Sequence, residues 1–288
     1  MFRTTLIAAT LSIAFAGAHA AQPLQVKVYN ADGNSFNVNS TLVYGEKEAM
    51  VIDAGFTRAD ALRIAANVLD SGKELKTIYV SQADPDYYFG VETLKEIFPT
   101  AEVVTTPAVL AKINAKLAGK IAFWGPKMGA NAPRTPVLPK AISGTTLTVD
   151  GQTVEIRGTT GPLAHRPYAW IPSIKAVVGN IGVFGANMHV WTADTQTVAE
   201  RSAWVAQLDE MAALQPALVV PGHMPAGTAL DVSNVTYTKG YLQAFEKNAA
   251  ATKTSAELID AMKKAYPAAP MGLSLEIGAK VNKGEMKW

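Results

Sequence analysis

Apolar and polar residues along the first part of the chain follow the period of β-strands and then that of α-helices. A meander of strands comes first, and from Thr57 apolar side chains recur at helical spacing until Gly72 ends a helix. Further strands and helices then alternate, which predicts an α/β fold. The predicted ranges are strands at 25–29, 35–44, 49–53, 75–80 and 103–105, and helices at 57–69, 89–98 and 108–117.

The regular pattern fails between residues 119 and 139, where Pro133, Pro136 and Pro139 follow an aromatic stretch. A loop of that length is usually functional or mobile, so we expect residues 120–139 to form a lid over a site. Beyond it, Asp150-Gly151 predicts a hairpin turn. The later ranges are strands at 145–149, 153–157, 168–171, 174–178, 180–184 and 217–220, and helices at 198–214, 237–252, 255–266 and 273–280.

The first twenty residues have the pattern of a secretory signal. Arg3 precedes an apolar run at 6–16, and Ala18-His19-Ala20 provides an A-x-A cleavage site. The alternatives are a membrane anchor or a buried helix, but the run is well short of the roughly 20 residues that span a bilayer. We therefore expect a signal peptide at 1–20, then a single domain at 21–288 that is secreted or periplasmic and not stably inserted in a membrane.

Composition excludes several classes of function. The chain has no cysteine, which excludes disulfides, thiolate zinc ligands and cysteine nucleophiles. The net charge is +2 without a basic cluster, which argues against a nucleic acid partner. We expect a small-molecule substrate, and the C-terminal helices with Trp288 offer a surface for a homodimer. A serine hydrolase or a nucleotide-binding protein is disfavoured, because the sequence has no Gly-x-Ser-x-Gly, P-loop or Gly-x-Gly-x-x-Gly motif.

Acidic and histidine side chains gather where predicted strands end. Asp84 and Asp86 follow a buried strand, and the three histidines after the signal, His165, His189 and His223, all fall in loops after strands. This set suits zinc, iron or manganese, and it also suits metal-free acid–base chemistry. The structural alternatives are that each histidine is a satisfied structural residue and that Asp84-Pro85-Asp86 is a turn and helix cap.

Five ordered segments resemble the motifs of the metallo-β-lactamase fold superfamily. The resemblance covers about residues 24–224 and implies a four-layer αββα sandwich with its site at one edge of two sheets. The segments are Val51-Ile52-Asp53-Ala54-Gly55, Ser81-Gln82-Ala83-Asp84-Pro85-Asp86-Tyr87-Tyr88-Phe89-Gly90, Gly158-Thr159-Thr160, Val178-Gly179-Asn180 and Val219-Val220-Pro221-Gly222-His223.

The second motif departs strongly from the family pattern. That pattern is His-x-His-x-Asp-His, and of the family's metal ligands only Asp86 and His223 are unchanged here. The usual pair of zinc ions is therefore not expected. The other family ligand positions hold Gln82, Asp84, Tyr87, Thr159 and Asn180.

The residues that remain predict one divalent metal ion, either zinc, iron or manganese. Asp84, Asp86 and His223 would hold it, joined by His165 or His189 if their loops fold inward. Asp86 and His223 would carry the chemistry, in which the metal polarises water to hydrolyse a small ester, lactone, amide or phosphoester. The alternative is a metal-free pseudoenzyme or ligand-binding module on the same fold.

Other residues are expected around this site. Asp53 resembles the family's supporting aspartate. Like Asp53, Gln82 and Asn180 are expected to support the residues of the site without touching the metal or the substrate. Tyr87 and Trp191 are candidate substrate contacts. Tyr87 could instead be core, and Trp191 could instead be buried to hold a loop in which Asp194 caps the next helix. Arg166 either binds an anionic substrate or pairs with a carboxylate.

Overall fold

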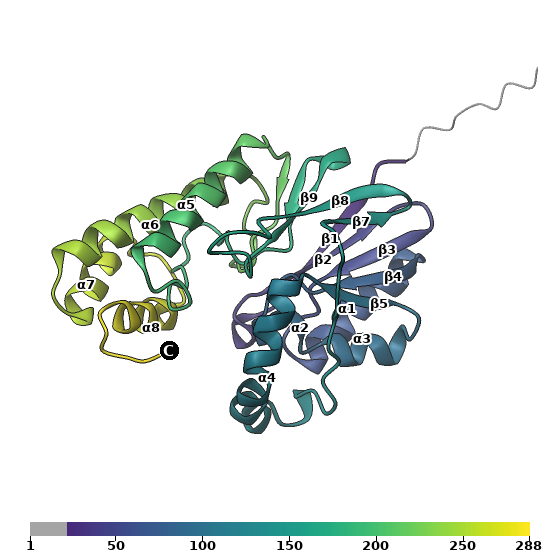
Figure 1. The fold of residues 1–288 in the computed structure, drawn as a ribbon, viewed down its shortest axis with the longest axis horizontal. Helices are drawn as coiled ribbons and strands as arrows, with labels where there is room; N and C mark the ends of the chain where they lie inside the picture. The colour runs from purple at the N-terminus through teal and green to yellow at the C-terminus, as the bar shows by residue number, and fades with distance from the viewer. Residues whose placement is uncertain (1–21) are drawn as a thin grey trace, which may run out of the picture.

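The computed structural model describes residues 22–288, in which two β-sheets lie face to face with helices on their outer sides (Figure 1). The signal peptide predicted at residues 1–20 lies outside the described residues. Among residues 22–288, no helix combines the length and the apolar character that crossing a bilayer requires.

The first sheet has six strands, which follow one another in space in the order of the sequence. They are β1 (Gln25–Asn30), β2 (Asn39–Tyr44), β3 (Glu48–Ile52), β4 (Glu74–Tyr79), β5 (Glu102–Thr105) and β6 (Lys140–Ala141). The first three pair antiparallel as the predicted meander, and β3 to β6 are parallel. Parallel neighbours need crossover connections, which contain α1 (Arg58–Ser71), α2 (Pro85–Tyr88), α3 (Val91–Ile97) and α4 (Pro107–Met128).

The second sheet has five strands. In spatial order they are β11 (Leu218–Val219), β10 (Ala176–Val178), β9 (Tyr168–Ile171), β8 (Gln152–Arg157) and β7 (Thr146–Val149). Neighbours pair antiparallel except β10 and β11, which are parallel. The predicted turn joins β7 to β8, where Asp150 and Gly151 both have positive φ, as a tight hairpin requires.

Three groups of buried side chains show that the molecule has four layers. On β3, Met50 and Ile52 point between the sheets, where they pack with Val178 of β10. Val51 points the other way and packs with α1 and α3. Val177 of β10 points away from the first sheet and packs with the C-terminal helices. Because successive side chains of a strand face opposite sides, this alternation confirms the predicted αββα sandwich.

The C-terminal helices cover the outer face of the second sheet and extend as a lobe beyond it (Figure 1). Trp204, Tyr241 and Phe245 are buried between these helices and the sheet. Two of the helices begin with a capping box, in which Thr197 or Thr254 exchanges hydrogen bonds with the residue three positions later. The helices are α5 (Val198–Ala213), α6 (Ser233–Ala251), α7 (Ser255–Ala265) and α8 (Gly272–Asn282).

The prediction of a lid loop at residues 120–139 is wrong for its first part, because helix α4 continues to Met128. Pro126 lies in the last turn of this helix, where its missing N–H removes one bond of the hydrogen-bond ladder. Trp124 explains why the helix continues, since its ring centroid lies 5.5 Å from that of Phe36 and 5.2 Å from that of Phe56. Packing of this aromatic side chain thus outweighs the local helix-breaking signal.

Other predicted boundaries differ in smaller ways. The strand predicted at 180–184 is absent, because the Asn180 side-chain oxygen accepts a hydrogen bond from the Val183 N–H and turns the chain. Phe184 makes only an isolated bridge with His223. Short 3₁₀ helices interrupt the chain at η1 (Gly33–Ser35), η2 (Gly129–Asn131) and η3 (Pro172–Ile174), the first of which overlaps the start of the strand predicted at 35–44.

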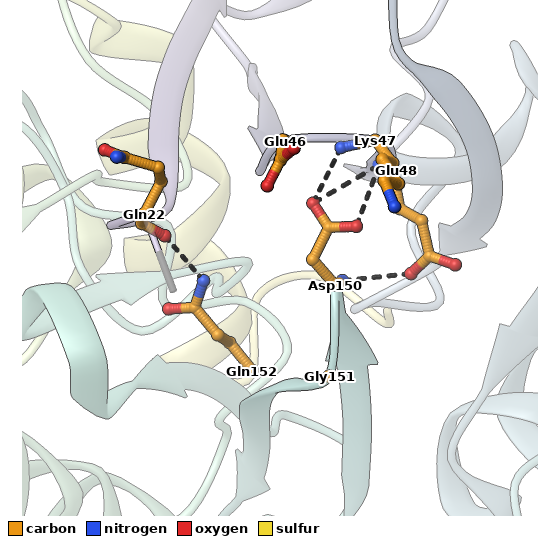
Figure 2. Close-up of a pocket in the computed structure, with 7 residues that line it drawn as sticks. All are labelled: Gln22, Glu46, Lys47, Glu48, Asp150, Gly151 and Gln152. Atoms are coloured by element: carbon orange, nitrogen blue, oxygen red, sulfur yellow. Dashed lines mark hydrogen bonds between the residues drawn. The ribbon is translucent and has the colours of Figure 1, made fainter. Parts of the chain in front are cut away.

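A polar pocket of about 310 Å³ lies where the β2–β3 turn meets the β7–β8 hairpin (Figure 2). The Asp150 carboxylate accepts from the N–H groups of Lys47 and Glu48, and Glu48 in turn accepts from the Asp150 N–H. A side chain at Gly45 would come within 2.2 Å of the Asp150 carboxylate and would displace it from these hydrogen bonds. The contacts join the two sheets at the amino end of β3, opposite the edge described next.

Candidate functional site

The candidate site lies at the carboxyl ends of β3 and β4. Asp53, which follows β3, supports it through hydrogen bonds to Ser81. Asp53 has a φ of 68°, in the left-handed region that aspartate adopts more readily than most residues other than glycine. Each of its carboxylate oxygens lies 2.7 Å from a donor of Ser81, one from the N–H and one from the hydroxyl. Burial raises the pKa of Asp53 to about 8. Asp53 thereby fixes the start of the loop that carries Asp84 and Asp86.

Asp86 and His223 form the central contact of the site. Asp86 lies in the first turn of α2, and His223 follows β11. The His223 Nδ1 is 3.0 Å from the Phe36 carbonyl, which can only accept, so Nδ1 carries the proton and Nε2 is the free acceptor. That Nε2 lies 3.6 Å from the Asp86 Oδ2. We refer to these two side chains as the Asp86–His223 pair.

The Asp86–His223 pair has opposite shifts in pKa. Burial, with the negative charge of Asp84, raises the pKa of Asp86 to about 8. Burial, with the positive charge of Arg166, lowers the pKa of His223 to about 4. Near pH 7 the carboxyl therefore holds a proton while the imidazole is neutral. A proton donor and a free nitrogen acceptor then face each other, which is the arrangement that general acid–base chemistry uses.

Family metal-ligand positions are occupied by side chains that make internal hydrogen bonds, two of which join the two halves of the sandwich. Gln82 donates to the Pro167 carbonyl at 2.8 Å, and the Tyr87 hydroxyl donates to the Asn180 carbonyl at 3.2 Å. The Asn180 amide donates to the Val220 carbonyl at 2.9 Å. Tyr87 is completely buried, so the core reading is confirmed and the predicted substrate contact by Tyr87 is wrong.

The side chains predicted as metal ligands do not converge on one site in the structure. Between residues 22 and 288, no three histidine, aspartate or glutamate side chains converge as metal ligands. The His189 Nδ1 lies 3.0 Å from the Tyr241 hydroxyl of α6, which places it in the helical lobe. His165 lies half-buried in the loop before β9, where burial and the charges of Arg166 and Lys112 lower its pKa to about 4. The residues present therefore do not fit a protein-built metal site.

Helix α4 contributes lysines that the sequence analysis missed. The Lys120 Nζ lies 3.4 Å from Asp84, and the Lys116 Nζ lies 3.8 Å from Asp194. Figure 1 shows α4 between the helices of the first sheet and the lobe of α5 to α8. Lys112, Lys116 and Lys120 are four residues apart and share one helix face, a signal that becomes readable only once this segment is known to be helical.

The loop that contains Trp191 is held by Asp194. Its carboxylate accepts from the indole N–H of Trp191 at 2.6 Å and from that of Trp288 at 2.9 Å. The predicted cap of the following helix by Asp194 is wrong, because Thr197 caps α5. Trp191 is half-buried and its ring meets that of Trp288 edge-on.

Among the described residues, Arg166 lies buried beside Trp204 without an ion-pair partner. Only 4% of its surface is exposed, and among residues 22–288 no carboxylate comes within 4.0 Å of it. Its Nη2 makes one long bond of 3.5 Å to the Ile181 carbonyl, and its guanidinium lies 4.5 Å above the Trp204 ring. Its Nε has no partner. The predicted alternative, a direct pair with a carboxylate, is wrong.

The two facing sheets with the Asp86–His223 pair at their edge define the metallo-β-lactamase type of αββα sandwich. The family model of the metallo-beta-lactamase superfamily matches residues 33–173. Residues 33–173 are thus similar to a hydrolase-type superfamily whose members generally bind divalent metals. No curated protein matches the chain by sequence.

Solved structures share the fold at low sequence identity. A metallo-beta-lactamase from Pontibacter korlensis is 18% identical, with 78% of this chain and 97% of that chain covered and a TM-score of 0.53. A beta-lactamase domain protein from Burkholderia ambifaria is 11% identical, with 92% and 85% covered and a TM-score of 0.63. A metallo-beta-lactamase family protein from Thermus thermophilus is 17% identical, with 91% and 93% covered and a TM-score of 0.62. At such identities the likeness shows the fold alone.

Proposed function

We propose that this protein is a hydrolase of a small ester, lactone, amide or phosphoester in which the Asp86–His223 pair makes the proton transfers. One observation carries this proposal. The buried carboxyl and the free imidazole nitrogen lie 3.6 Å apart, with pKa shifts that leave one proton on the carboxyl near pH 7. Such a pair can give a proton to a leaving group and take one from water.

The proposed reaction balances without a further reactant. Water adds to the carbonyl carbon or phosphorus, and its proton goes to the His223 Nε2. The bond to the leaving oxygen or nitrogen breaks, and that atom takes the proton of the Asp86 carboxyl. The proton on Nε2 then returns to the Asp86 carboxylate. The Phe36 carbonyl holds the imidazole in the required tautomer throughout, because it accepts from Nδ1.

The single zinc, iron or manganese ion that the sequence predicts is not part of this proposal. Asp86 and His223 are two donors, and the third donor of a protein-built site is missing among the described residues. Gln82, Tyr87 and Asn180, which stand at family ligand positions, are engaged in internal hydrogen bonds. The proposed steps therefore use only side chains of this chain.

Those internal hydrogen bonds favour one second candidate, a ligand-binding module without turnover. They stabilise the sandwich directly, so the fold could persist after the family chemistry was lost. The two candidates differ in one measurable respect. The hydrolase converts its substrate, whereas the binding module only retains it.

We also propose that the protein is secreted or periplasmic and acts on a small molecule rather than on nucleic acid. The A-x-A pattern at Ala18-His19-Ala20 and the small net charge support this. The intact mass of protein recovered from the extracellular or periplasmic fraction tests it. A chain that begins at Ala21 is expected, and a full-length chain in the cytoplasm would contradict the proposal. Sedimentation of the same sample tests the expected homodimer.

A substrate screen tests the proposed function. Purified mature protein would be assayed on a panel of small esters, lactones, amides and phosphoesters, beside Asp86→Asn and the control Asp70→Asn. Asp70 is exposed at the end of α1, away from the site. We expect turnover that falls about a hundredfold or more in Asp86→Asn and is unchanged in Asp70→Asn. A panel without turnover, or equal rates in both variants, would contradict the proposal.

A further inference from the structure

The buried guanidinium of Arg166 has an unmet need for a negative partner. A buried charge is normally paired, because an unpaired one loses the solvation of water without a replacement. Arg166 has only the long bond to Ile181 and the Trp204 ring, and its Nε has no acceptor. Burial lowers the pKa of this guanidinium, yet a guanidinium stays charged in proteins. An oxyanion would supply what the protein does not.

The two carboxylates that act most strongly on the charge of Arg166 are already paired with other groups. Asp84 and Asp194 both act on the Arg166 charge. Lys120 lies 3.4 Å from Asp84, and Lys116 with two indole N–H groups surrounds Asp194. These contacts leave the positive charge of Arg166 free for a ligand.

Contacts connect Arg166 to the Asp86–His223 pair. Its Nη2 bonds to the Ile181 carbonyl, Ile181 packs with Tyr87, and the Tyr87 ring meets the His223 ring edge-on. Lys120 reaches Asp84, two residues before Asp86, from α4 and is only partly exposed, so a second cation lies beside the loop that carries Asp86. Lys112 and Lys116 continue the positive face of α4 towards solvent, which favours the approach of an anion.

We propose that Arg166 and Lys120 bind a carboxylate or phosphate group of a small molecule beside the Asp86–His223 pair. Arg166 offers the planar fork that matches two oxygens of such a group, and Lys120 adds a mobile point charge. This inference deepens the proposed function, on which it rests for the identity of the ligand as substrate, because it makes the substrate an anion. The binding step itself needs no turnover and can be measured separately.

Isothermal titration calorimetry on the full mature protein tests the site with two probes, acetate and inorganic phosphate, each at ionic strength matched with chloride. Saturable binding of at least one probe is expected, and the preferred probe tells whether the group is a carboxylate or a phosphate. Arg166→Met and Lys120→Gln should each weaken that binding, the former by about tenfold or more. Arg157→Gln is the matched control, because Arg157 is already paired with Glu155 and should bind the probe as the unaltered protein does.

Thermal unfolding adds a readout that a merely structural Arg166 would not give. Without a probe, Arg166→Met should unfold at a higher temperature than the unaltered protein, since it removes a buried unpaired charge. With the probe, the unaltered protein should gain stability and Arg166→Met should not. If Arg166→Met does not fold, Lys120→Gln decides. Absence of saturable binding, or binding that both Arg166→Met and Lys120→Gln leave unchanged, would overturn the inference.

The two proposals fail in different ways. Saturable probe binding that depends on Arg166, in a protein without turnover on the panel, would retain the anion site and reject the hydrolase. Turnover that depends on Asp86, with no probe binding, would retain the hydrolase and reject the anion site.

Discussion

The chemistry of the site depends on where single residues place their protons. The Phe36 carbonyl fixes the proton of His223 on Nδ1, and burial keeps the proton of Asp86 on its carboxyl near pH 7. Neither shift needs a metal. Both follow from the low polarity at the edge of the sandwich, where Phe184 stacks on the His223 ring and Tyr87 meets it edge-on.

The pKa of Asp86 predicts how hydrolysis depends on pH. The carboxyl donates a proton only while it is protonated, so kcat/KM should fall as the pH rises through about 8. On the acid side, the rate should fall as His223 becomes protonated near pH 4. A profile of kcat/KM between pH 4 and 10 measures both limbs. A rate that rises steadily through pH 8 would show that the ionised Asp86 is the active form.

The same residue predicts a dependence of stability on pH. Above the ordinary pKa of 3.8, unfolded Asp86 releases a proton that the folded protein keeps until about pH 8, so stability falls with rising pH in between. Asp53 acts in the same direction, and His223 opposes both only below about pH 6.5. Between pH 6.5 and 8 each carboxyl should remove up to about 1.4 kcal/mol per pH unit.

Urea unfolding at several values of pH between 6.5 and 8 measures this effect. The slope of the unfolding free energy against pH should become smaller in Asp86→Asn and stay unchanged in Asp70→Asn. A stability that rises with pH over this window would mean that Asp86 is ionised in the folded protein.

At the scale of elements, most strands and helices could be predicted because their apolar periodicity agrees with their place in the fold. Helix α4 could not be predicted fully, since its last turns depend on contacts of Trp124 with Phe36 and Phe56, which are distant in the sequence. The predicted strand ends correctly brought Asp86 and His223 to one site. The same reasoning wrongly suggested that His189 could join them. The path of its loop is set by the bond to Tyr241, and no local pattern reveals that bond.

Two neighbouring aromatic residues test whether α4 is a packed helix. Trp124→Ala removes the contacts with Phe36 and Phe56 and should cost about 2 to 3 kcal/mol of stability. Phe123→Ala is the control, because Phe123 is 55% exposed and mainly meets Lys127 and Trp124, so its loss should cost about 0.5 kcal/mol. Chemical denaturation of both variants provides the comparison. Equal, small effects would favour the predicted loop instead.

At the scale of the whole molecule, the two halves of the sandwich are joined by direct contacts where family members generally place metal ions. Gln82 and Tyr87 each bond to a carbonyl of the second half, and Asn180 bonds to Val220 within that half. Gly222 allows this closure, since the Asn180 carbonyl and the Tyr87 hydroxyl approach its backbone closely. The sequence showed that the ligands are replaced, but only the structure shows that two of the replacements bond to the opposite half.

A methyl group at Gly222 would disturb this junction. In Gly222→Ala the new Cβ would lie 2.2 Å from the Asn180 carbonyl and 2.5 Å from the Tyr87 hydroxyl, so we expect a loss of about 2 to 3 kcal/mol. Gly240→Ala is the control inside α6, where a new Cβ meets nothing within 4 Å. That change should stabilise the protein by about 0.5 to 1 kcal/mol. Equal melting temperatures for the two variants would show that the junction is loose.

The most direct test of the account is the metal dependence of kcat/KM on the best substrate of the panel. Mature protein would be dialysed against a chelator and assayed alone and then with added zinc, iron or manganese. We predict that kcat/KM survives dialysis and does not rise with any of the three ions, because the Asp86–His223 pair makes the proton transfers. Activity that disappears on dialysis and returns with one ion would contradict it and would show that Asp86 and His223 hold a metal.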